Sequence, residues 1–176
     1  MHFVIVPGIN GSDENHWQSI WEGEWGQAAS RIAPSSWDEP EVDDWCQALD
    51  RAVADATDVV LVAHSLGCIT AIEWAARTRP AVLGMFLVAP PDTTRADFPA
   101  EASTFTALTP VPLDVPGLLV TSEDDPYCTT DAADQLAKAW RVDHLSAGRT
   151  GHINSTSDLG RWEFGRALLT AFTAGR

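Results

Sequence analysis

The stretch "LVAHSLGCIT", residues 61–70, places a serine where an apolar run passes into a helical pattern. The run before Ser65 is rich in β-branched residues and favours a buried strand, and the residues from Leu66 onward favour a helix. A tight turn from such a strand into a helix exposes a serine hydroxyl at the carboxyl edge of a sheet, where α/β folds bind ligands. Ser65 is therefore either a nucleophile or the N-cap of a helix, and other residues must decide.

The five residues "AHSLG" match the nucleophile pattern G-x-S-x-G except at its first position. Ala63 replaces the first glycine, a change between two small residues that still lets the following helix pack closely. Gly67 keeps the second glycine. An isolated S-x-G after a strand does not by itself establish a nucleophile.

A serine hydroxyl is a weak nucleophile unless a neighbouring imidazole takes its proton, and the chain has five histidines. His152 lies in the polar, glycine-flanked segment "GRTGHINST" after the last predicted strand, from which a base can reach across to the serine. His16 stands in the first long loop or at a helix start, near enough to line a pocket. His64 adjoins the serine, but successive side chains at a strand end point to opposite faces, so we expect it to be a packed neighbour and a possible pocket residue, not the base. The remaining histidines belong to predicted strands: His2 and His144.

Three carboxylates follow another buried run directly, in "GLLVTSEDDPYC": Glu123, Asp124 and Asp125. A carboxylate beside the imidazole fixes its tautomer and stabilises the imidazolium that forms in the reaction. Acidic residues at a strand end can also make a solvated turn, and Asp before Pro is ordinary turn chemistry. The order serine, acid, histidine, each after a strand of a parallel sheet, is however the α/β-hydrolase order, and it favours the catalytic interpretation.

Acyl transfer also needs two donors for the oxyanion of the tetrahedral intermediate. The backbone amide of Leu66, at the start of a helix, is one candidate. The second is expected in the loop "PGINGSD" after the first strand, where Gly8 and Gly11 allow close approach of the backbone. We assign it to Ile9, with Asn10 as the alternative. This loop matches neither G-x-G-x-x-G nor G-x-x-x-x-G-K-[ST], so a phosphate cradle is disfavoured.

Short apolar runs that would place these residues alternate with segments of helical period. Near-continuous apolar runs at 2–6, 59–64, 83–89 and 117–122 are typical of strands buried on both faces of a parallel sheet, and 31–33 and 141–147 are weaker candidates. Helices are predicted around 17–21 and 42–56, and over 66–78, 129–140 and 159–173. The pattern predicts an α/β doubly wound fold with about six parallel strands.

Residues 90–116 form one long irregular stretch with six of the 11 prolines. A segment of this length without clear periodicity is usually a functional loop, here with one short helix around 99–107. We expect this loop and the region around His16 to shape a pocket.

The composition bounds the remaining possibilities. A chain of 176 residues, 45% hydrophobic, is sized for a single domain over residues 1–176. A formal net charge of -14 disfavours nucleic acid and anionic membranes as partners. No apolar run reaches the roughly 18 residues of a membrane span, and the start "MHFVIVPG" does not read as a signal peptide, so a cytoplasmic location is expected. The cysteines form no CxxC pair and are expected to be free thiols: Cys46, Cys68 and Cys128.

The chain resembles the small serine hydrolases of the α/β-hydrolase superfamily, the group that includes retinoblastoma-binding protein 9 and its bacterial relatives. The resemblance covers almost the whole chain and rests on "VPGINGS" with "HWQSIWE", on "VAHSLGC", on "SEDDPYC" and on "GHINSTSDLGRWEFG". It implies a compact α/β-hydrolase fold without a large cap and strand order 2-1-3-4-5-6. It also implies Ser65 as nucleophile, His152 as base and an aspartate of "DDPY" as acid, and the superfamily pattern around the acid favours Asp125 over Asp124.

Two positions depart from the patterns of that group. Thr70 replaces the acid of an L-x-C-x-E segment linked to binding of the retinoblastoma protein, so no such partner is carried over. Cys128 stands where an aliphatic residue is common and is expected to pack beside the acid. Among the eight tryptophans, Trp17, Trp21 and Trp45 lie on apolar helix faces and are expected in the core. Core packing is also the simpler interpretation of Trp162, which is at the same time a candidate for the pocket wall near His152.

These features together predict a serine hydrolase that needs no metal or cofactor and cleaves small-molecule acyl esters through an acyl-enzyme. Two alternatives stay open. One is a non-catalytic binding or scaffold protein on a hydrolase fold, and the other is an acyltransferase or thioesterase using the same site.

Overall fold

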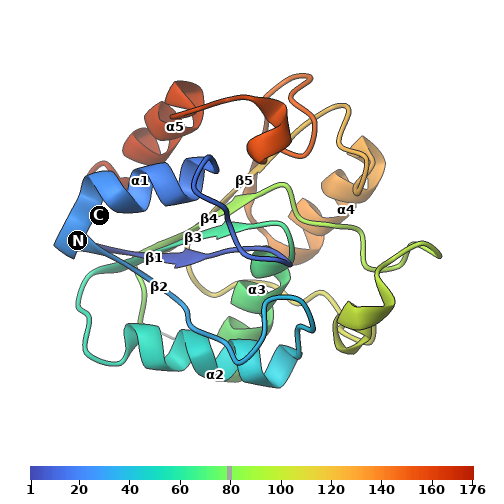
Figure 1. Cartoon of the computed structure of the whole chain (residues 1–176), viewed down its shortest axis with the longest axis horizontal. Helices are drawn as coiled ribbons and strands as arrows, with labels where there is room; N and C mark the ends of the chain where they lie inside the picture. Colours follow the sequence, from blue (N-terminus) through green and yellow to red (C-terminus); the bar gives the residue numbers. More distant parts are fainter. Residues whose placement is uncertain (79–80) are drawn as a thin grey trace.

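Six parallel strands form one sheet in the order β2-β1-β3-β4-β5-β6, in a computed structural model that describes residues 1–78 and 81–176 (Figure 1). The strands are β1 (His2–Val6), β2 (Ala29–Arg31), β3 (Val59–His64), β4 (Gly84–Val88), β5 (Gly117–Thr121) and β6 (Asp143–Ser146). The strand order is the predicted one, with β1 beside β3. The loop after β1 and the turn after β3 therefore meet at the carboxyl edge of the sheet.

Helices cover both faces of this sheet. They are α1 (Trp17–Trp25), α2 (Val42–Val53), α3 (Leu66–Thr78), α4 (Thr130–Trp140) and α5 (Glu163–Thr173). Figure 1 shows α1 and α5 on one side of the sheet and α2 and α3 on the other, and α4 packs on the α2 and α3 side. The predicted α/β doubly wound fold is thus confirmed.

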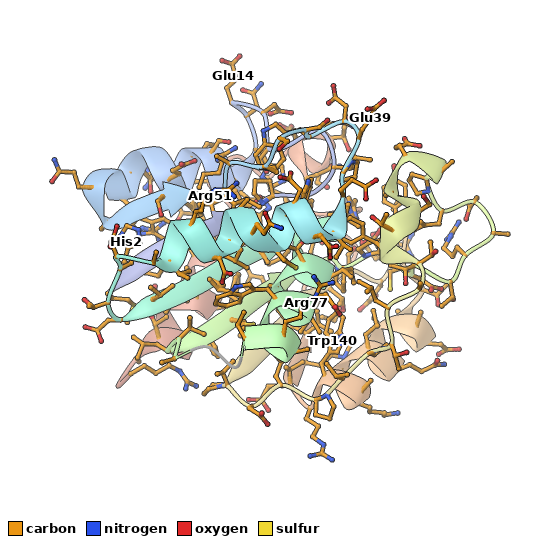
Figure 2. All side chains as sticks on the ribbon, turned by 90° about the horizontal axis from the view of Figure 1, so that it is seen from below. His2, Glu14, Glu39, Arg51, Arg77 and Trp140 are labelled. Atoms are coloured by element: carbon orange, nitrogen blue, oxygen red, sulfur yellow. The ribbon has the colours of Figure 1, made fainter. Side chains whose placement is uncertain are left out.

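Alternating strand residues fill the two cores. On β3, Leu61 and Ala63 face the core under α2 and α3, while Val60 and Val62 face the core under α1 and α5. All residues of β3, β4 and β5 are buried, which is why these strands read as continuous apolar runs. Figure 2 looks from the α2 side and shows this helix in front of the sheet. Asp43 of α2 pairs with Arg77 of α3 at 2.6 Å.

The edge strand β2 differs from its prediction. The sequence predicted a strand at 31–33, whereas pairing with β1 runs over Ala29–Arg31 and joins Phe3 to Ala29. The apolar residue Ile32 follows the strand and turns into the core, with 2% of its surface exposed. An edge strand is half-covered and needs no apolar run, so the hydrophobic signal marked the residues after the strand instead.

Several element ends also shift by a few residues. Helix α2 ends at Val53, three residues before its predicted end. Helix α5 begins at Glu163 instead of 159, because Trp162 adopts a left-handed backbone with φ 43° that cannot continue a helix. In the 90–116 loop, a 3-10 helix η2 (Ala100–Phe105) replaces the short helix expected at 99–107. No helix in the described ranges has both the length and the apolar character that a membrane span requires.

Candidate active site

Ser65 occupies a sharp turn between β3 and α3. Its φ is 53°, a left-handed conformation that costs a non-glycine residue about 1–3 kcal/mol. An N-cap residue normally has an extended backbone and accepts a hydrogen bond through its side chain. Here the N–H of Cys68 donates instead to the carbonyl oxygen of Ser65, at 2.9 Å. The Ser65 hydroxyl is left for another contact, which argues against the capping alternative.

Two glycines allow the end of β1 to lie against this turn. A Cβ on Gly67 would come within 2.1 Å of the carbonyl oxygen of Val6, and a Cβ on Gly8 would come within 2.7 Å of the Cβ of Ser65. Neither position can carry a side chain without moving backbone or the serine itself. The second glycine of the nucleophile pattern and the first glycine of the "PGING" loop are thus both required for this close approach.

Ser65, His152 and Asp125 form a connected line. The Ser65 Oγ lies 2.9 Å from His152 Nε2, and His152 Nδ1 lies 2.9 Å and 3.0 Å from the two carboxylate oxygens of Asp125. The Asp125 side chain is 2% exposed, and Oδ1 also accepts the N–H of Tyr127 at 2.9 Å. With Nδ1 donating to the carboxylate, Nε2 is free to accept the serine proton.

The other two carboxylates of "SEDDPY" have different partners. Asp124 accepts the N–H of Gly151 at 2.9 Å and the hydroxyl of Ser122 at 2.8 Å, and these two contacts, in that order, lower the pKa of its carboxyl. Glu123 accepts the hydroxyl of Ser146 at 3.2 Å. Asp124 therefore binds the backbone of the loop that carries His152, while Asp125 contacts the imidazole.

His64 and His16 lie next to His152 as two further buried rings. The ring centroids of His64 and His152 are 4.9 Å apart, and those of His16 and His64 are 4.7 Å apart. Nδ1 of His16 accepts the N–H of Gln18 and so caps α1, while its Nε2 is buried and finds no partner within the described ranges. Burial lowers the pKa of His16 to about 4 and holds the pKa of His64 well below its ordinary value. Both rings are neutral at pH 7.

The remaining histidines lie outside this group. His2 contacts the hydroxyl of Ser30 at 2.9 Å, and His144 contacts that of Thr121 at 2.7 Å. Neither lines the cavity beside Ser65.

Two backbone amides, one from the loop after β1 and one from the start of α3, are free to donate hydrogen bonds to an oxyanion. Within the described part of the chain, the amides of Ile9 and Leu66 have no hydrogen-bond acceptor, and both residues line the cavity beside Ser65. The amide of Asn10 donates to the carbonyl of Trp37 at 2.9 Å. Asn10, the alternative donor predicted from the sequence, lines the cavity, but its backbone N–H is already used in this hydrogen bond.

A cavity of about 670 Å³ opens over the serine. Its polar lining includes residues of the β1–α1 loop, His16 and residues 154–156, and a hydrogen bond of 2.8 Å from Ser155 to Asp13 joins the loop to the last of these. The 90–116 loop adds Pro91, Phe98 and Ala102 to the apolar lining. The same loop also contributes charged lining residues: Asp92, Arg95, Asp97 and Glu101.

Two aromatic residues near the site are placed differently relative to the cavity. Trp162 does not line the cavity: it is 4% exposed, stacks on Trp21 at 5.9 Å and packs against Trp17 at 5.0 Å, because its left-handed backbone turns the ring back under α1. Tyr127, which sequence reasoning did not single out, lines the cavity with its ring 4.6 Å from that of His152. Its place in "DDPYC", two residues after the acid, is the signal that would have found it.

The cysteines are free, as predicted, and all three are buried. Burial raises the pKa of Cys128, near the acid, to about 12. Its thiol is therefore protonated at neutral pH and is a poor nucleophile.

Comparison with known proteins agrees with this geometry. A family model described as "Serine hydrolase" matches residues 3–171. Among solved structures, a protein classed as a YdeN-like hydrolase from Pectobacterium atrosepticum is 32% identical, with 97% of this chain and 89% of that chain covered and a TM-score of 0.85. None of the curated proteins matches the chain.

Two more distant structures share the fold. The ydeN gene product of B. subtilis is 20% identical over 97% of both chains, with a TM-score of 0.80. Est1E from Butyrivibrio proteoclasticus, solved with ferulic acid bound, is 13% identical with a TM-score of 0.71, covering 95% of this chain and 87% of that one. At these identities the likeness concerns the fold alone.

Proposed function

The chain belongs to the serine hydrolase family, and from this premise we propose that it hydrolyses esters of small, uncharged acyl groups, with Ser65 as nucleophile, His152 as general base and Asp125 as the orienting acid. The observation that carries the proposal is the contact of 2.9 Å between Ser65 Oγ and His152 Nε2, with the far side of the imidazole held by a buried carboxylate. A hydrogen bond of this length is within reach for proton transfer during attack.

The proposed reaction has two halves. Ser65 Oγ attacks the ester carbonyl as its proton passes to His152 Nε2, and the oxyanion accepts hydrogen bonds from the amides of Ile9 and Leu66. The C–O bond of the leaving group then breaks, and His152 returns the proton to the departing alcohol. A water molecule next attacks the acyl-enzyme with His152 again as base, which releases the acid and restores the Ser65 hydroxyl.

Asp125 keeps the imidazole in the productive tautomer and stabilises the imidazolium that forms in each half. The neighbouring rings of His16 and His64 suit this task because they carry no charge at pH 7, so they add no repulsion to the imidazolium.

The cavity wall supports an uncharged acyl group as substrate. The side chains of Phe98 and Ala102 offer apolar surface, whereas Asp13, Asp92 and Glu101 place negative charge among the lining residues. The lining cation Arg95 is paired with Asp97 at 2.6 Å. An anionic acyl chain would meet net repulsion, and a neutral one would bury its methylenes against the apolar side.

Hydrolysis of p-nitrophenyl acetate, butyrate and hexanoate tests this function. We expect turnover by the native protein and a loss of at least 10³-fold in kcat with Ser65→Ala. Ser103→Ala, which changes an exposed serine outside the cavity lining, serves as the matched control and should retain native kcat. Equal kcat for Ser65→Ala and the native protein would reject the proposal, and no turnover of any ester by the native protein would favour the binding-protein alternative.

A further inference from the structure

Two buried side chains hold the backbone of the loop that carries His152. Nε2 of His64 lies 2.9 Å from the carbonyl oxygen of His152, and Nε1 of Trp17 donates to the next carbonyl oxygen, that of Ile153, at 2.8 Å. The side chains that provide these donors come from the end of β3 and from α1. Only 4% of His64 and 1% of Trp17 is exposed, so solvent does not replace either contact.

The loop itself has no regular structure to fix the imidazole in place. Gly148, Gly151 and Ile153 all have left-handed backbones, with φ of 74°, 59° and 49°. Before the histidine, the loop is held at Gly151 by the carboxylate of Asp124. At the histidine itself and after it, the backbone is held by His64 and Trp17. The position of the base therefore depends on side chains that reach in from other elements.

The contact also defines the protonation of His64. A carbonyl oxygen only accepts, so Nε2 of His64 must carry the hydrogen. Burial keeps this ring neutral, and the neighbouring His16 ring is neutral for the same reason. His64 is thus a fixed donor and does not share in proton transfer between Ser65 and His152.

We propose that His64 is a positioning residue, whose Nε2–H anchors the backbone carbonyl of His152 and so sets the approach of the imidazole to Ser65. The inference rests on the proposed function, because it assigns His64 a role only if His152 is the base. One consequence is that the nucleophile Ser65 and the anchor His64 are consecutive residues, although His64 and the base His152 are 88 positions apart in the chain. Any shift of the end of β3 would therefore move Ser65 and His64 together, and His64 would move the backbone of His152 with them.

A pair of variants with nearly the same shape tests this role. The amide nitrogen of Gln stands as many bonds from the backbone as Nε2 of His, and the terminal methyl of Met stands at the same place without a hydrogen to donate. We expect His64→Gln to keep kcat within about threefold of native. His64→Met should lower kcat by about 10- to 100-fold, since a displacement of about 1 Å in a reacting group can cost that much. KM should change little in both, because His64 borders the cavity with only 4% of its surface exposed and acts through the base.

Thermal unfolding of the same two variants shows whether a loss of kcat comes from a less stable fold. A loss of kcat in His64→Met at an unfolding temperature close to that of His64→Gln supports positioning. Equal kcat in His64→Met and His64→Gln would overturn the proposal, as would a loss in His64→Met that appears in KM alone. If His64→Met does not fold, His64→Asn gives a second test: its amide is one bond shorter and cannot reach the carbonyl, so the same loss of kcat is expected, and native kcat would refute the role.

Failure of the proposed function would look different from failure of this inference. If Ser65→Ala and His152→Ala keep full activity, the triad itself is wrong. If those two variants are inactive while His64→Met is native-like in kcat, the triad stands and only the anchoring role of His64 is removed.

Discussion

His152 directs Nδ1 at the carboxylate of Asp125, at 2.9 Å and 3.0 Å from its two oxygens. The preceding carboxylate, that of Asp124, binds the backbone N–H of Gly151 instead. Adjacent acidic residues thus serve the same loop in different ways, one through its imidazole and one through its backbone.

This difference predicts a large gap between two conservative variants. Asp125→Asn should lower kcat by about 10³- to 10⁴-fold, because an amide no longer holds the tautomer in which Nε2 accepts the serine proton. Asp124→Asn should lower kcat by less than about tenfold, because Asp124 contacts the loop and not the imidazole. Steady-state kinetics with p-nitrophenyl butyrate measures both. A larger loss in Asp124→Asn than in Asp125→Asn would contradict the assignment.

The close approach of β1 to the turn at Ser65 predicts that alanine at Gly67 lowers the stability of the fold, whereas alanine at Gly23, an open position, does not. Gly67→Ala should destabilise the fold by about 3 kcal/mol or more, because its Cβ would meet backbone oxygens of Val6 and Pro7 that cannot move freely. Gly23→Ala on α1 should stabilise by up to about 1 kcal/mol, because a Cβ there would meet no atom beyond its own helix backbone within 4 Å in the described ranges. Urea unfolding compares the two, and equal stability of Gly67→Ala and native protein would show that the close approach is absent.

Burial of His16 predicts a loss of stability in mild acid. Its pKa is about 4 in the folded protein, chiefly through desolvation, against an ordinary value of 6.5. Between these values the unfolded chain binds a proton that the folded chain does not, so stability falls as the pH drops from 6.5 to 4, by about 3 kcal/mol from this group.

His16→Asn isolates that contribution, because Asn also caps a helix N-terminus but does not titrate. Urea unfolding at pH 7, 5.5 and 4.5 should show a smaller loss of stability with falling pH in the variant than in the native protein. Parallel pH profiles would mean that His16 is not buried as a neutral ring.

The apolar wall of the cavity predicts a change in acyl preference. Phe98→Ala should raise kcat/KM for longer esters relative to acetate, by about fourfold for each further methylene that fits, since burying a CH₂ contributes about 0.8 kcal/mol. Phe164→Ala, at an exposed position on α5, is the control and should leave the order of the esters unchanged. An unchanged order in Phe98→Ala would place the acyl chain elsewhere in the cavity.

Much of the fold was predictable because its signals are local. The buried strands β3, β4 and β5 read as apolar runs, and a serine between such a run and a helix marks the turn at Ser65. Strand β2 was misplaced because this edge strand, Ala-Ser-Arg, carries little apolar signal, and the nearest large apolar residue, Ile32, belongs to the core after it.

The site was less predictable where it depends on the direction of a turn. Asp124 and Asp125 both follow β5, and spacing alone does not say which one faces the imidazole; the resemblance to serine hydrolases favoured Asp125. Whether Trp162 lies at the cavity or in the core could not be predicted either, because the left-handed backbone before α5 is invisible in the sequence. The contact of His64 with the loop of His152 joins residues 88 positions apart and follows only from the packed structure.

Reaction with a fluorophosphonate, followed by tandem mass spectrometry, tests the central claim most directly. The reagent forms a covalent bond only with a serine that a neighbouring base activates. We predict one adduct per chain, on the hydroxyl of Ser65, and no adduct in Ser65→Ala. An adduct at another residue, or equal labelling of the native protein and Ser65→Ala, would contradict the account.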